Sequence, residues 1–119
     1  MNEEQIKTIG KILLGAAFSD GHADGSELDA IVDILEAFVG GALPEGMVTE
    51  LEAFDWHEFD VKAACESLAL QTSDDRRALL VLVAEIIEAD EMLDNDEEAY
   101  VRMVARYLNA KPAEYMDLV

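Results

Sequence analysis

Two acidic segments seventy residues apart repeat one pattern, and this duplication constrains the fold more than any other feature of the chain. Residues 20–27 and 90–97 both read D-x-x-x-D-x-x-E, with no gap between the first and the last carboxylate. Apolar residues at helical spacing precede and follow each segment. The self-similarity predicts an internal repeat of helix, acidic turn and helix.

The predicted fold is all-α: a compact single-domain helical bundle of two pseudo-symmetric helix–acidic turn–helix repeats over residues 1–119. The repeat halves are expected at about 3–54 and 73–119, and a bridging helix at about 56–71 joins them. This helix could start at residues 55–58 or at Asp60. Neither half is large enough to bury its own apolar face, so the two should share one core. Within the halves we expect helices over 3–18, 26–39, 44–54, 72–88 and 95–108, and a short C-terminal helix from Pro112 that mirrors the Pro44 helix.

Helical periodicity also predicts where several side chains lie. Phe38 and Val39 are expected on the buried face of the second helix, whereas Lys7 and Lys11 should face water. Cys65 should pack as a small hydrophobe, and His57 should lie at the surface. A cluster of aromatic residues is expected to cover the junction between the halves: Phe54, Trp56 and Phe59.

The sequence also predicts contacts of basic residues and one helix cap. Glu98 and Arg102 have the spacing of an i,i+4 ion pair. Arg102 and Arg106 lie one turn apart, which suits either docking of an acidic neighbour or neutralisation of nearby carboxylates. Residues 72–75 read as a capping box that opens the next helix.

Composition narrows the class of protein. Half of the 119 residues are hydrophobic, which excludes a disordered acidic tail despite a net charge of −19. The apolar runs are far shorter than the roughly 20 residues that span a bilayer. The start lacks the basic region of a signal peptide, and a single cysteine excludes an internal disulfide framework. We expect a soluble, cytoplasmic protein.

The charge also bears on partners and on catalysis. The acidic surplus disfavours nucleic acid and anionic lipid, and favours divalent cations or a basic protein. Direct insertion into a membrane is not expected. The chain has no phosphate-binding glycine loop, no nucleophile elbow and only two isolated histidines, so we expect no enzymatic activity.

The acidic segments allow two interpretations. Their second and third acids fit N-cap and N3 positions of the following helices, where negative charge suits the helix dipole. The first acids, Asp20 and Asp90, should lie at or just past a helix C-terminus, where negative charge opposes the dipole. An acid placed unfavourably twice at the same offset suggests cation coordination in addition to capping.

Carboxylate ligands indicate a hard ion, Ca²⁺ or Mg²⁺. Neither segment is an EF-hand, because the twelfth positions are Ile31 and Val101, where a bidentate glutamate is required. A structural zinc site is not expected from two histidines and one cysteine.

The helix–acidic segment–helix units, with residues 20–35 and 86–97 carrying the motif, resemble the TerB tellurite-resistance family over nearly the whole chain. The resemblance implies an all-helical cytoplasmic module, linked to tellurite resistance, stress and membrane-associated assemblies. Glu91 departs from the motif, because the first segment has Gly21 there. Carried over to this sequence, the family's divalent-cation ligands are Asp20, Asp24, Glu27, Asp90, Asp94 and Glu97.

Two functional hypotheses follow. In the first, the chain is a TerB-like module that binds divalent cations through both acidic segments. In the second, it is a metal-independent acidic module that docks a basic or membrane-associated protein partner. The resemblance favours the first.

Overall fold

The described structure consists of helices and the loops that join them. The computed structural model describes residues 2–18, 25–88 and 95–118, except the side chains of residues 25–27, 56, 87–88 and 95–97. These ranges contain no strand, which confirms the all-α prediction, and none of their helices is long and apolar enough to cross a membrane. In chain order the elements are α1 (Glu3–Phe18), α2 (Gly25–Val39), α3 (Glu45–Glu52), η1 (Trp56–Glu58), α4 (Val61–Leu68), α5 (Ser73–Glu88), α6 (Asn95–Tyr107), η2 (Pro112–Glu114) and η3 (Met116–Leu118).

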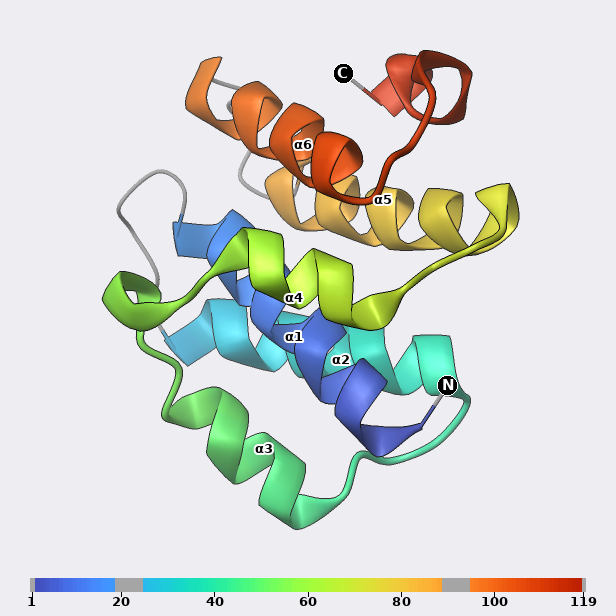
Figure 1. The fold of residues 1–119 in the computed structure, drawn as a ribbon. Coiled ribbons are helices and arrows are strands. Elements are labelled where there is room, and N and C mark those ends of the chain that lie inside the picture. Colours follow the sequence, from blue (N-terminus) through green and yellow to red (C-terminus); the bar gives the residue numbers. More distant parts are fainter. Residues whose placement is uncertain (1, 19–24, 89–94, 119) are drawn as a thin grey trace.

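The helix boundaries repeat along the chain. α1 ends at Phe18 and α5 at Glu88, while α2 begins at Gly25 and α6 at Asn95. Each pair is seventy positions apart, which is the offset of the two acidic segments. In Figure 1 these four helix ends all lie toward the left of the molecule. The repeat seen in the sequence is therefore a repeat of helices.

α1 is the centre of the core. It packs against α2, α3, α4, α5 and α6, and Figure 1 shows it running through the middle of the bundle. This is possible because its buried residues lie on several sides of the helix: Ile9, Ile12, Leu13, Leu14, Ala16 and Ala17. Apolar residues from both halves pack in the same cluster, including Ile31, Leu35, Leu79, Leu80, Val83, Val101 and Val104. One core thus stabilises the whole chain.

The end of α2 differs from the prediction. Phe38 and Val39 are 36% and 38% exposed, although the sequence pattern placed them in the core. The helix stops directly afterwards at Gly40, whose φ of 77° suits glycine, and the Gly40 amide donates to the Glu36 carbonyl at 2.9 Å. The prediction was wrong because periodicity marks one face of a helix, and only the covered part of that face becomes buried.

Lys7 is also placed differently from the expectation that it faces water. Its side chain is 18% exposed, and its Nζ lies 3.0 Å from Glu4 Oε1 and 2.9 Å from Glu50 Oε2. The hydrogen bond with Glu50 is the main cause that raises the pKa of Lys7. Lys11 is half-buried. A lysine stem can lie against apolar surface while its ammonium reaches a carboxylate, so Lys7 joins α1 to α3.

The segment that joins the halves contains more than one element. The sequence left two starts open for the bridging helix, at 55–58 or at Asp60; the structure has the short turn η1 at the first and begins α4 after the second. Asp55 Oδ1 accepts from the His57 amide at 2.9 Å, and Asp60 Oδ1 accepts from the Ala63 amide at 3.1 Å. Each aspartate thereby starts a separate element, because its side chain competes with continued helical bonding.

Cys65 and His57 of this region lie as predicted, whereas the side chain of Trp56, predicted to join the aromatic cluster, is not among those that the structure describes. Cys65 is 2% exposed and belongs to the core, and His57 is exposed. The Phe54 ring packs against Phe59 at a centroid distance of 5.1 Å and against Phe18 at 5.7 Å. These rings connect α1 with the segment between α3 and α4.

The two halves end differently. Pro44 precedes the eight-residue α-helix α3, whereas Pro112 begins the 3₁₀ turn η2, which is followed by η3. The expected mirror of the Pro44 helix is therefore absent from residues 112–118. These residues instead form a C-terminal tail that lies beside α5 and α6 at the top of Figure 1.

Candidate functional site

The predicted cation ligands lie outside the described residues. Four of them fall in residues 19–24 and 89–94, and the other two are helical residues whose side chains are not described. They are Asp20, Asp24, Glu27, Asp90, Asp94 and Glu97. The structure does describe the helices on both sides of each acidic segment.

The helix ends agree with the predicted positions of the acids along the chain. α1 ends two residues before Asp20, and α5 ends two residues before Asp90. α2 and α6 begin one residue after Asp24 and Asp94, respectively. The first acid of each segment thus follows a helix C-terminus and the second directly precedes a helix N-terminus, as both the capping and the coordination hypotheses require.

Acidic residues elsewhere are dispersed. Within residues 2–18, 25–88 and 95–118, no group of three or more His, Cys, Asp or Glu side chains could hold a metal ion. Asp29 and Asp33 are exposed on α2, while Glu36 accepts a hydrogen bond from the Leu43 amide at 3.3 Å. The two acidic segments remain the candidates for cation binding.

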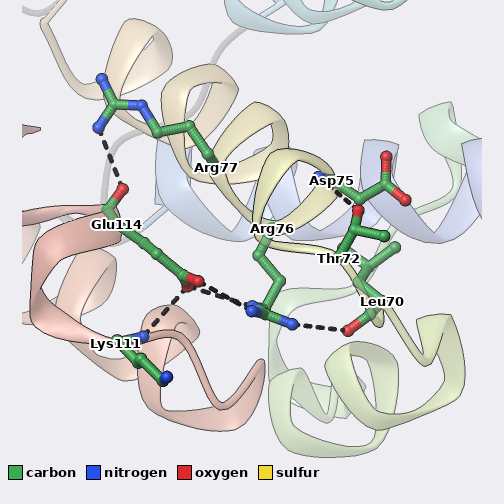
Figure 2. Close-up of polar contacts among 7 residues, drawn as sticks. All are labelled: Leu70, Thr72, Asp75, Arg76, Arg77, Lys111 and Glu114. Carbon is green, nitrogen blue, oxygen red and sulfur yellow. Dashed lines mark hydrogen bonds and ion pairs between the residues drawn. The ribbon is translucent and has the colours of Figure 1, made fainter.

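Two neighbouring arginines at the start of α5 hold the C-terminal tail. Arg76 donates from Nε and Nη2 to the two carboxylate oxygens of Glu114, at 3.1 and 2.8 Å, and from Nη1 to the Leu70 carbonyl at 3.4 Å (Figure 2). The Lys111 amide donates to the same carboxylate at 3.1 Å. Arg76 and Glu114 are only 15% and 11% exposed, so this two-bond pair is protected from water.

Arg77 makes a second pair beside the first. It donates from Nη1 to the Glu114 carbonyl at 3.0 Å and from Nη2 to Asp117 Oδ2 at 2.8 Å. The hydrogen bonds from these arginines are the main cause that lowers the pKa of Glu114 and of Asp117. We call Arg76, Arg77, Glu114 and Asp117 the C-terminal clamp. The clamp was not predicted from the sequence, where its only signal is the close spacing of the two arginines and of the two acidic residues.

A groove with positive charge lies between α6 and the clamped tail. Its volume is about 420 Å³. The Arg102 guanidinium in this groove pairs with Glu98 at 2.9 Å, which confirms the predicted i,i+4 pair. We call it the α6 groove, and it is lined by Ala99, Arg102, Met103, Arg106, Tyr107 and Tyr115.

Two buried groups that could do chemistry are held in unreactive states. Burial raises the pKa of Cys65 to about 12, so the thiol is protonated at neutral pH. Burial also raises the pKa of Tyr100, whose hydroxyl donates to the Ile12 carbonyl at 2.8 Å. Both groups therefore serve the packing of the core.

The sequence was compared with models of protein families. The model described as "Tellurite resistance protein TerB" matches residues 5–118. The chain belongs to the TerB family. The match includes both acidic segments, the bridging segment and the C-terminal tail, so family membership applies to the fold as a whole. No curated protein and no solved structure matches the chain.

The TerB match confirms the resemblance drawn from the acidic motifs and their flanking helices. It also agrees with the helix boundaries, which repeat at the offset of those motifs. The described part of the chain adds two features to the acidic motifs: the C-terminal clamp and the α6 groove.

Proposed function

We propose that this TerB family member is a cytoplasmic module that binds divalent cations through its two acidic segments and acts in tellurite resistance and the stress response. The main support is the repeated D-x-x-x-D-x-x-E motif, bounded in both copies by helices that end and begin at the same offset. The proposed ligands are Asp20, Asp24, Glu27, Asp90, Asp94 and Glu97.

The chemistry of these residues suits Ca²⁺ or Mg²⁺, because all six offer carboxylate oxygens. Bound cations would also relieve the self-repulsion of a chain with a net charge of −19. The carboxylates of the acidic segments repel tellurite, an oxyanion, so the role of this cation site in tellurite resistance would be indirect. The proposal is a binding function rather than catalysis.

Calcium titration with two-dimensional amide NMR tests the proposal, with magnesium as a second ion. We expect saturable shifts centred on Gly21, Asp24, Glu91 and Asp94. The Asp20→Asn/Asp90→Asn double variant should lose this response. A matched control is Asp29→Asn/Asp33→Asn, which removes the same charge from exposed positions of α2 and should bind calcium as the wild type does.

Thermal unfolding gives an independent measurement. A cation that binds only the folded chain stabilises it by about 2.7 kcal/mol at one hundred times its Kd. Equal calcium responses in the wild type and in Asp20→Asn/Asp90→Asn would overturn the proposal. Non-saturating shifts spread over all acids, reduced equally in both double variants, would indicate counterion screening and leave the segments as helix caps.

An acidic docking module is the second candidate, and the exposed carboxylates of Asp29 and Asp33 on α2 favour it. Such a module would bind a basic protein through its net negative charge, with strong salt dependence and no response to chelators. Affinity capture at low and high salt, with and without a chelator, tests this. The absence of any salt-sensitive partner at low salt would contradict it.

A further inference from the structure

The α6 groove combines charge, apolar surface and a volume of ligand size. Its volume of about 420 Å³ lies within the range of roughly 300–1,000 Å³ that is typical of small-molecule sites. One wall comes from α6, and Tyr115 of the C-terminal tail contributes to the other. The C-terminal clamp holds the tail on α5, and the tail supplies the Tyr115 side of the groove.

Two arginines of α6 line this groove. Arg102 and Arg106 are one helical turn apart and therefore lie on the same face. Arg102 has one exposed partner, Glu98, at 2.9 Å. Arg106 is exposed, and its guanidinium has no ion pair or hydrogen bond to any residue that the structure describes. By contrast, Arg76 and Arg77 are both bound by carboxylates of the tail.

The position of Arg106 in the last turn of α6 has an ordinary explanation, because a cation there suits the helix dipole. The helix dipole does not explain why apolar and aromatic side chains line the rest of the α6 groove. Met103, Tyr107 and Tyr115 are partly buried and pack against the core, which fixes their positions. Neither tyrosine hydroxyl is hydrogen-bonded to another described residue, so both can donate to a ligand.

We propose that the α6 groove binds a small oxyanion, a carboxylate or a phosphate, carried on a flat apolar body. Arg106 binds the oxyanion through two parallel N–H donors, Arg102 adds a second positive charge, and Tyr107, Tyr115 and Met103 contact the apolar part. The net charge of −19 restricts the ligand to one or two negative charges, because a polyanion is repelled at long range.

NMR titration of the full chain with phenylphosphonate tests the proposal, at constant ionic strength and without divalent cations. Saturable shifts are expected at the side-chain Nε–H of Arg106 and at Tyr107 and Tyr115. Benzyl alcohol, which lacks the charge, and inorganic phosphate, which lacks the ring, should each bind more weakly. Benzoate in place of phenylphosphonate distinguishes a preference for carboxylate from one for phosphate.

Arg106→Gln should weaken phenylphosphonate binding at least about tenfold. The matched control is Lys62→Gln, which removes the same charge from an exposed position of α4 outside the groove and should leave the Kd unchanged. Both positions are exposed, so circular dichroism should show folded proteins. The proposal is overturned if no saturable shift occurs at millimolar phenylphosphonate. Equal Kd values for wild type and Arg106→Gln, or equal weakening by both substitutions, would also overturn it.

Discussion

Gly15 of α1 leaves the space in which the side-chain hydroxyl of Tyr100 from α6 lies. The Tyr100 hydroxyl donates to the Ile12 carbonyl at 2.8 Å, and Tyr100 is 3% exposed. A Cβ on residue 15 would overlap this hydroxyl and would lie 3.4 Å from the Phe59 ring. The missing side chain thus allows a contact between the first and the second half at the centre of the core.

We expect Gly15→Ala to destabilise the fold by about 1–3 kcal/mol, because Tyr100 is buried and has no open space into which to move. Urea unfolding measures the change. Gly46→Ala in α3 is the control, since no atom lies within 4 Å of the added Cβ. That substitution should be neutral or should stabilise by up to about 1 kcal/mol through helix propensity. Equal effects of the two substitutions would contradict the argument.

A double-mutant cycle isolates the contact itself. Tyr100→Phe alone should cost about 1 kcal/mol, the usual net contribution of one buried hydrogen bond. In the Gly15→Ala background the same change removes the overlapping hydroxyl, so it should cost less or even restore stability. The free energies of unfolding of the four proteins give the coupling. Strict additivity would show that the alanine methyl group is accommodated without disturbing Tyr100.

Periodicity alone predicted the order of the helices. Apolar spacing placed a helix over residues 3–18, where α1 lies, because such spacing reports which face of a helix can be buried. The same rule failed at Phe38 and Val39, where nothing in the local pattern reveals that the neighbouring helices stop covering α2.

The polar contacts between residues far apart in the chain were less predictable than the local ones. The Glu98–Arg102 pair lies within one helix, and the i,i+4 rule found it. Arg76 and Glu114 are 38 positions apart, and their pairing depends on where the tail packs. The acidic segments were found from sequence because they repeat, whereas the α6 groove needs Tyr115 of the tail beside α6.

Substitutions in the buried part and at the exposed end of α2 allow a direct comparison of their effects on stability. Leu35→Ala should cost about 2–5 kcal/mol, because Leu35 is fully buried. Phe38→Ala, one turn later, removes a larger side chain that is 36% exposed and should cost clearly less. Urea denaturation of the two variants checks the order. A larger loss for Phe38→Ala would mean that this ring is covered in solution.

The C-terminal clamp should make the tail sensitive to acid. The pKa values of Glu114 and Asp117 lie below their ordinary values of 4.5 and 3.8, mainly through the hydrogen bonds from Arg76 and Arg77. A lowered folded-state pKa means that the stabilisation is complete above the ordinary pKa and is lost as the pH falls through the folded-state value. Amide NMR of residues 111–118 should therefore be constant from pH 7 to about 5 and change at lower pH.

A substitution in the C-terminal clamp tests its role at neutral pH, and a second substitution outside the clamp is the matched control. Glu114→Gln should increase hydrogen exchange in the tail at neutral pH, and should also weaken phenylphosphonate binding, because Tyr115 lines the α6 groove. Glu98→Gln removes the same charge from an exposed pair within α6 and should leave the tail amides unchanged. Unaltered tail exchange in Glu114→Gln would show that apolar packing alone holds the tail.

Cys65 should make the fold sensitive to alkali. Burial raises its pKa from 9.0 to about 12, and a raised folded-state pKa gives stabilisation that is complete below pH 9.0 and lost as the pH rises toward about 12. At pH 10 the loss from this thiol alone should be about 1.4 kcal/mol relative to pH 7. Urea unfolding at both values measures the total loss, to which the raised pKa of Tyr100 also contributes.

Cys65→Ala separates the two contributions, because it keeps Tyr100 and removes the thiol. The variant should be less stable than the wild type at pH 7, as a buried side chain is shortened, but its stability should fall less between pH 7 and pH 10. Parallel pH dependences would mean that the thiol ionises as readily in the folded chain as in the unfolded one. In that case a thiol reagent at pH 8 would modify the native protein as fast as the urea-unfolded chain, whereas a buried, protonated Cys65 reacts only when the core opens.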